Sequence, residues 1–292
     1  MNPLSQSWHI HIDVTQYCPD DCIYCSRYMR HQRPDHKYHM SLEMFEKALW
    51  SLREFPNRIG LMGGEPTIHP QFEQICEILQ GEPVLPEHGQ YKGYLRYSLF
   101  TEGGARYRKF KESGLLDRTF QYIAVFEHTA EQKAVCKHQP TTLAIGDMVK
   151  DKELKDRLID DCWAQKTWCP NITPKGAFFC ELASGIDRII DGPGGWPIEK
   201  FWWDKTPEQY QDQVDRYCDL CGFPVPVVRE TMAAKKERVS SGLLKIMRER
   251  NLPRLGENDI IEITEPFTNE EISEAAKTWN PGKFRDDLVG CG

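Results

Sequence analysis

The stretch Val14-Thr-Gln-Tyr-Cys18-Pro-Asp-Asp-Cys22-Ile-Tyr-Cys25 decides both the fold and the chemistry of this 292-residue chain. It follows residues 8–14, whose alternating side chains predict a β-strand. Three thiols therefore lie close together just after a strand, and thiolates are the usual ligands of iron–sulfur clusters. Three thiolates can hold three irons of a four-iron cluster and leave the fourth iron open, which is where metal-centred chemistry takes place.

The cysteine spacing alone leaves two other interpretations open. Structural zinc sites use cysteines at similar short spacings, and three unrelated buried thiols would give the same pattern. A second motif follows another predicted strand. Residues 58–62 are typical of a strand, and Gly63-Gly64-Glu65-Pro66 follows directly. Two independent motifs in this order, each at the C-terminal end of a strand, argue against a chance pattern.

Together the two motifs resemble those of the radical S-adenosylmethionine (radical SAM) enzymes. In that family an aromatic residue precedes the last cysteine, as Tyr24 does here, and a Gly-Gly-Glu-Pro turn receives the amino group of SAM. The resemblance implies that Cys18, Cys22 and Cys25 form the catalytic centre by holding a [4Fe–4S] cluster to which SAM binds. It also implies that SAM is contacted by Tyr24, Gly63, Gly64, Glu65 and Pro66.

Alternating strands and helices predict an α/β fold with a parallel sheet. Beyond the first two strands, the pattern predicts strands at residues 94–100, 121–126 and 141–145, with helices between them. The resemblance implies a partial (β/α)6-type TIM barrel that is open on one side. Because only one clear unit follows residue 126, we expect the barrel to be trimmed at its end.

Polar residues follow the third and fourth predicted strands. Thr101-Glu102-Gly103 resembles the Thr-Asn-Gly ending found in radical SAM barrels, with a carboxylate in place of the amide. Glu102 could contact SAM or the substrate, or could cap the next helix. Glu127 and His128 end the fourth strand, where barrel residues face the active site. They are candidate contacts, and a surface loop position is the alternative.

The bulk composition narrows the classes of partner. The chain is 40% hydrophobic, and it contains no stretch as long as a membrane span. The N-terminus lacks the layout of a signal peptide, so we expect a cytoplasmic protein. The net charge of −7 argues against a nucleic-acid-binding surface, which is normally basic. Eleven cysteines in a reducing compartment indicate metal or redox ligands more than disulfides.

A second set of cysteines follows the predicted barrel. The stretch 162–180 contains a predicted hairpin, with its turn at residues 174–176 and its return strand at 177–179, and residues 218–221 form a Cys-x-x-Cys motif. This arrangement resembles the SPASM and twitch extensions of radical SAM enzymes, in which four thiolates bind an auxiliary [4Fe–4S] cluster. The resemblance implies one such cluster here. Its candidate ligands are Cys162 or Cys169, with a preference for Cys162, together with Cys180, Cys218 and Cys221. A four-cysteine zinc site is the alternative.

These features divide the chain into three predicted segments. Residues 1–160 would form the radical SAM partial barrel and residues 161–222 the auxiliary-cluster domain. Residues 223–292 would form a helical C-terminal extension, which packs against the core or a partner subunit. Within it we expect a charged helix at 233–250 and a last helix that starts with a capping box at Thr268 and Glu271.

The resemblance also implies the reaction. Reductive cleavage of SAM gives a 5′-deoxyadenosyl radical, which abstracts a hydrogen atom from the substrate, and a flavodoxin- or ferredoxin-type protein supplies the electron. A single auxiliary cluster, with no peptide-recognition domain expected before Trp8, favours the oxidation of a small molecule such as a sugar, cyclitol or nucleotide-linked metabolite. The alternatives are a peptide-modifying radical SAM enzyme and, outside enzymes, a zinc-bound structural or interaction protein.

Overall fold

A computed structural model describes residues 1–82, 96–167 and 170–279 of the chain. Its centre is a six-stranded sheet with the order β4-β3-β2-β1-β6-β7. Five of these strands run parallel, and only β7 is antiparallel to its neighbour β6. The strands are β1 (His9–Thr15), β2 (Arg58–Gly63), β3 (Tyr97–Thr101), β4 (Tyr122–Val125), β6 (Asn171–Thr173) and β7 (Gly176–Phe178).

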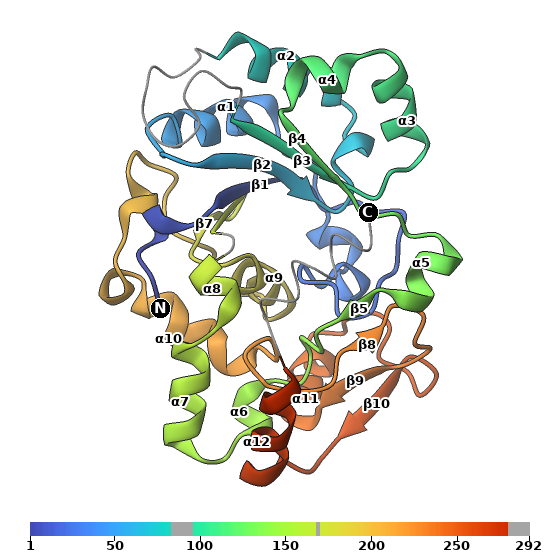
Figure 1. Cartoon of the computed structure of the whole chain (residues 1–292), viewed down its shortest axis with the longest axis vertical. Helices are drawn as coiled ribbons and strands as arrows, with labels where there is room; N and C mark the ends of the chain where they lie inside the picture. Colours follow the sequence, from blue (N-terminus) through green and yellow to red (C-terminus); the bar gives the residue numbers. More distant parts are fainter. Residues whose placement is uncertain (83–95, 168–169, 280–292) are drawn as a thin grey trace.

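The first four strands and the helices between them form the predicted alternating α/β pattern. α1 (Leu42–Ser51) begins at Ser41, whose side chain accepts a hydrogen bond from the Met44 N–H, as expected of an N-cap. α2 (Phe72–Gly81), α3 (Ala105–Glu112) and α4 (Leu115–Thr119) follow β2 and β3. These helices lie on one side of the sheet, and the later part of the chain lies on the other (Figure 1).

After β4 the chain leaves the sheet, so the alternating strand–helix units stop there, which agrees with the expected trimming of the partial barrel. The expected strand at 141–145 is absent, because residues 141–144 form a turn that leads into α6 (Ile145–Met148). A short apolar run in the sequence is compatible with a strand and with other buried segments, so the pattern alone does not decide between them. Here the run is buried against the C-terminal part of the chain: the Thr142 hydroxyl donates to the Arg238 carbonyl, and the Ala144 N–H donates to the Ser240 hydroxyl.

The predicted hairpin is present and completes the sheet beside β1. β6 pairs in parallel with β1, on the edge opposite to β2, and β7 returns alongside β6. α9 (Glu181–Ile189) follows, and all of its residues are buried. The other helices of this region are α5 (Ala130–Val135), α7 (Lys152–Asp160), α8 (Trp163–Thr167) and α10 (Gln211–Tyr217).

The C-terminal segment is not wholly helical, which corrects the expectation. The predicted helix at 233–250 divides into β9 (Glu237–Ser240) and α11 (Ser241–Glu249). β9 pairs in parallel with β10 (Ile260–Ile263), and β5 (Lys137–His138) pairs antiparallel with β8 (Glu230–Thr231). The last helix, α12 (Asn269–Thr278), starts at the predicted capping box.

One apolar core extends through all three predicted segments. It contains Ile10 and Ile12 of β1, Phe178 of β7 and Val239 of β9, each with no exposed surface. The C-terminal segment therefore packs against the core of the same chain. Within the described ranges, no helix is both long enough and apolar enough to cross a membrane.

Candidate active site

The Gly-Gly turn lies against the backbone of the cysteine loop. The Gly64 N–H donates to the Thr15 carbonyl and the Glu65 N–H to the Tyr17 carbonyl, each over 2.8 Å. A Cβ at Gly63, whose φ is +143°, would lie 2.2 Å from the Thr15 oxygen, and one at Gly64 would lie 2.0 Å from the Tyr17 oxygen. Only glycine fits such a close approach, so the turn and the cysteine loop fold as one unit.

Gly64→Ala is therefore expected to displace the cysteine loop and to lower the free energy of unfolding by about 1–3 kcal/mol, the usual cost of overpacking. Gly81→Ala is the matched control, because a Cβ there meets nothing within 4 Å. Chemical denaturation of the two metal-free variants measures the effect. Equal stability of the two variants would contradict the close approach.

Glu65 joins the ends of β2 and β3. Its carboxylate accepts hydrogen bonds from the Thr67 N–H, the Thr67 and Thr101 hydroxyls and the Glu102 N–H, over 2.6–2.9 Å. The residue is only 1% exposed. The expected contact of Glu65 and Pro66 with SAM stays a prediction, and the described geometry instead shows Glu65 tying the two strand ends together.

A cavity of about 530 Å³ opens at these strand ends. Its wall includes the cysteine loop, the ends of β2 and β3, the residues after β4 and the start of α9. Of the residues predicted from sequence, the wall contains Cys18, Cys22, Tyr24, Cys25, Gly63, Gly64, Thr101, Glu102, Glu127 and His128.

The three thiols of the loop are held in an environment that disfavours free thiolates. Burial, and then the nearby Cys25, Asp20 and Glu65, raise the pKa of Cys18 to about 12. Burial also raises the pKa values of Cys22 and Cys25. Metal binding must therefore displace protons from these sulfurs. Three such thiols on one loop, all in the wall of one cavity, fit a cluster held by three ligands.

Asp20 and His128 form a polar group beside Cys22 that sequence reasoning identified only in part. His128 Nδ1 lies 2.8 Å from an Asp20 carboxylate oxygen and 3.6 Å from the Cys22 sulfur. The Lys133 ammonium donates to the other Asp20 oxygen over 2.7 Å. Although burial opposes it, these two partners lower the pKa of Asp20. Asp20 lies within the cysteine motif, but nothing in the local pattern predicts its partners from the β4–α5 segment.

The structure brings Cys162 together with Cys180, Cys218 and Cys221. Burial raises the pKa values of Cys180, Cys218 and Cys221, and the charge of Cys162 raises each of them further. The predicted alternative, Cys169, lies outside the described residues. As thiolates these four sulfurs would repel one another, and a bound metal group of positive charge would relieve that repulsion. The set therefore fits a metal site.

The described cysteines do not form a group as compact as a single loaded zinc site. A tetrahedral zinc ion with Zn–S bonds of about 2.3 Å holds its sulfurs roughly 3.8 Å apart. Among the described residues, no three cysteine sulfurs lie within 4.8 Å of one another, and only Asp20, Cys22 and His128 form a group that compact.

A buried ionic network connects the two cysteine sets, and sequence reasoning missed it. Arg27, two residues after Cys25, donates to Asp13 of β1 over 3.1 Å and to Glu181 of α9 over 2.9 Å. Glu181 directly follows Cys180 and also lies 3.3 Å from His11 Nδ1. Adjacency to cysteines was the only sequence signal for Arg27 and Glu181, both of which line the cavity.

Comparison with known proteins finds a family match in the segment that carries both motifs. Residues 12–122 match the family model described as the Radical SAM superfamily. No curated protein matches the chain. Among solved structures, the chain is similar to BtrN in complex with AdoMet and 2-DOIA, with 15% identity and a TM-score of 0.43 over 73% of this chain and 88% of BtrN. Residues 12–122 are therefore the segment of a radical SAM superfamily enzyme, and the cofactors of that superfamily are a [4Fe–4S] cluster and SAM.

Proposed function

We propose that this enzyme cleaves SAM reductively and oxidises a small molecule bound in the cavity, with the help of an auxiliary [4Fe–4S] cluster. The observation that carries the proposal is the composition of one cavity wall. Cys18, Cys22 and Cys25 line it on one side, and Glu181 and Leu182, which directly follow Cys180, line it as well. Both cysteine sets would then lie near the same bound substrate.

The chain's own residues would hold and orient the bound groups. Cys18, Cys22 and Cys25 are the proposed cluster ligands, and Cys162, Cys180, Cys218 and Cys221 the proposed auxiliary ligands. When bound, the cluster and SAM supply a 5′-deoxyadenosyl radical that removes a hydrogen atom from carbon, and the auxiliary cluster supplies an acceptor for the electron left behind.

The other predicted residues would position SAM in the cavity. Tyr24 would lie near the adenine, and the Gly63-Gly64 backbone near the amino group. Glu102 and Glu127 stand at the ends of β3 and β4 and offer carboxylates to the amino group of SAM or to the substrate. Burial, and then repulsion from Glu65, raises the pKa of Glu102, so this carboxylate gains from a cationic partner.

We propose a small polar substrate for this cavity. Its volume of about 530 Å³ lies within the range of small-molecule sites. The wall combines carboxylates (Glu127, Glu181) with cationic side chains (Lys137, Arg229) and the rings of Phe100 and Phe126. Charged groups of both signs suit a hydroxyl- or amine-bearing molecule such as a sugar, cyclitol or nucleotide-linked metabolite. A flavodoxin- or ferredoxin-type protein is the proposed electron donor.

The test is an anaerobic assay of iron-reconstituted protein with SAM, dithionite and a panel of deuterated sugars, cyclitols and nucleotide sugars. We expect transfer of deuterium into 5′-deoxyadenosine and a product two hydrogens lighter than its substrate, the second hydrogen leaving as a proton when the auxiliary cluster accepts the electron. Cys180→Ala is expected to lower the iron content from about eight to about four per chain and to stop product formation while SAM cleavage continues.

Cys76→Ala is the matched control, because Cys76 is buried in the apolar core on α2 and does not line the cavity. It should keep all of the iron. Zinc in place of iron in the wild-type protein would refute the proposed function. Full iron content in Cys180→Ala would remove Cys180 from the auxiliary site.

A further inference from the structure

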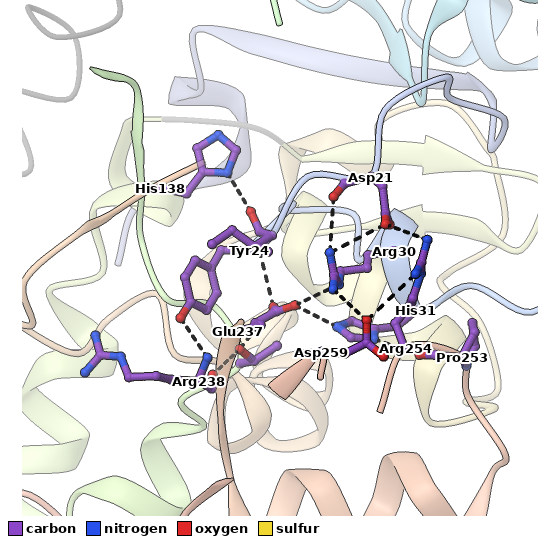
Figure 2. Close-up of polar contacts among 12 residues, drawn as sticks. Asp21, Tyr24, Arg30, His31, His138, Glu237, Arg238, Pro253, Arg254 and Asp259 are labelled. Carbon is purple, nitrogen blue, oxygen red and sulfur yellow. Dashed lines mark hydrogen bonds and ion pairs between the residues drawn. The ribbon is translucent and has the colours of Figure 1, made fainter. Parts of the chain in front are cut away.

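The cysteine loop is held from outside by a segment more than two hundred residues further along the chain. Residues 16–28 contain turns but no helix or strand, so the loop has no regular hydrogen-bonding pattern of its own. Figure 2 shows its contacts with residues 230–259, which belong to β8, β9 and the segment leading to β10. These contacts converge on Tyr24, between Cys22 and Cys25, and on Arg30 and His31 just after the loop.

Tyr24 is held by three hydrogen bonds, all of them to the C-terminal segment. Its main-chain N–H donates to Glu237 Oε1 over 3.2 Å. Its hydroxyl donates to a Glu230 carboxylate oxygen over 2.9 Å and accepts from the Arg238 N–H over 2.8 Å. Tyr24 has a φ of 54°, in the left-handed region that a residue with a side chain seldom adopts. The external hydrogen bonds stabilise this conformation.

Glu237 is the centre of the contact. It is 1% exposed, and its Oε1 also accepts from the Thr142 hydroxyl over 3.2 Å. Its other oxygen lies 3.0 Å from His31 Nε2 and 3.8 Å from the Arg30 side chain. The backbone of Glu237 is fixed in turn, because β9 pairs with β10 and the Glu237 N–H donates to the Asp259 carbonyl.

Further contacts surround this centre. Arg30 donates to Asp259 over 3.2 Å, and Arg254 pairs with Asp21 of the loop over 3.0 Å. The Ile23 carbonyl lies 2.8 Å from His138 Nδ1, and His138 belongs to β5, the partner strand of β8. The loop is therefore held at Asp21, Ile23 and Tyr24, on both sides of Cys22.

We propose that Glu237 is a positioning residue for the SAM-binding cluster, and that β9 holds Tyr24 in its left-handed conformation so that Cys22 and Cys25 enter the same cavity. This inference rests on the proposed function, since it assumes that the loop holds a cluster. Without the Glu237 carboxylate, the buried Tyr24 N–H would have no acceptor in this arrangement, and the loop would relax toward a more common backbone conformation.

The test compares Glu237→Ala with Glu237→Gln, which keeps an acceptor oxygen for the Tyr24 N–H. We measure iron release to a chelator and the electron paramagnetic resonance (EPR) spectrum of the reduced cluster with and without SAM. Glu237→Ala is expected to release the loop-bound iron about tenfold faster, because the Tyr24 N–H loses its hydrogen bond to a charged group, and to change the SAM-dependent spectrum. Glu237→Gln should restore most of the wild-type behaviour.

Glu262→Gln is the control, because Glu262 lies on the neighbouring strand β10 and its described contact is with Arg248. It should behave as wild type. If Glu237→Ala does not fold, Tyr24→Phe tests the same contact between Tyr24 and the C-terminal segment. This variant removes the two hydrogen bonds of the Tyr24 hydroxyl and keeps the ring. Wild-type iron release and spectrum in Glu237→Ala, or in Tyr24→Phe where that variant is used, overturn the inference. A wild-type protein that binds no iron would instead refute the proposed function.

Discussion

Replacing Cys18, Cys22 and Cys25 together by alanine is expected to abolish SAM cleavage and to leave about half of the iron in place. The three cysteines lie on one loop and line the cavity, and the second set, Cys162 with Cys180, Cys218 and Cys221, belongs to a different part of the fold. Removing the first set should therefore leave the second set able to bind its cluster, with about four irons per chain.

Anaerobic reconstitution followed by iron analysis, with mass spectrometry of 5′-deoxyadenosine, measures both quantities. The triple variant should give 5′-deoxyadenosine only at the level of the no-enzyme control. Cys180→Ala provides the reciprocal comparison, with the same iron content and SAM cleavage retained. Cleavage by the triple variant would contradict the assignment of these cysteines, and complete loss of iron would contradict a separate auxiliary cluster.

Arg27→Met is expected to lower the free energy of unfolding by about 3–5 kcal/mol, the usual cost of breaking a buried ion pair by removing one partner. Arg27 is 2% exposed and pairs with Asp13 and Glu181, which are themselves buried. Methionine fills much of the same volume, so the loss comes mainly from two buried carboxylates that no longer have their cation. Urea denaturation of the metal-free protein at neutral pH measures it.

Arg53→Met is the matched control. Arg53 also forms a two-hydrogen-bond contact with a carboxylate, that of Glu82, but its side chain is 47% exposed. Exposed ion pairs contribute about 0–1 kcal/mol, so this variant should be close to wild type. Similar losses in the two variants would show that the buried network does not stabilise the fold.

The pH dependence of the Arg27→Met effect follows from Glu181. Burial raises the pKa of this carboxyl, but Arg27 and His11 outweigh burial and hold the pKa at about 2. Because the pKa of Glu181 is lower in the folded than in the unfolded state, this carboxylate stabilises the fold at pH values above its unfolded-state pKa. That stabilisation is lost as the pH falls toward the folded-state pKa of about 2. Without Arg27, burial dominates and the folded pKa rises. The stabilities of the two proteins should therefore converge as the pH is lowered from 5 toward 2.

Local sequence patterns correctly predicted the elements that bury one face along their whole length. β1 alternates with period two, and the helices after β1 and β2 carry apolar stripes, so each element shows its own buried face. The segment 141–145 has no such pattern, because its apolar residues are buried by the C-terminal segment and not by a sheet. Likewise, Glu237–Ser240 lies within a charged run that resembles a helix face, and only its pairing with β10 makes it a strand.

The site divides in the same way. The cysteines and glycines at the strand ends could be predicted as site residues from the sequence. Thiols are metal ligands and glycine lacks a Cβ, so both residue types form recognisable local motifs. Arg27, Glu181 and Glu237 could not, since each acts through a residue far away in the sequence: Arg27 meets Glu181, and Glu237 meets Tyr24. A buried charge is stable only when it is paired, and the tertiary fold determines which residue pairs with it.

The position of β1 between β2 and β6 has a consequence for biosynthesis. β1 and β2 emerge early from the ribosome, but β6 joins the other edge of β1 only after residue 173 has been made, and Glu237 reaches the cysteine loop later still. Contacts between such distant residues form late in folding. The nascent chain therefore carries the three thiols before their surroundings are complete, and we expect iron–sulfur cluster delivery only after Glu237 has been translated.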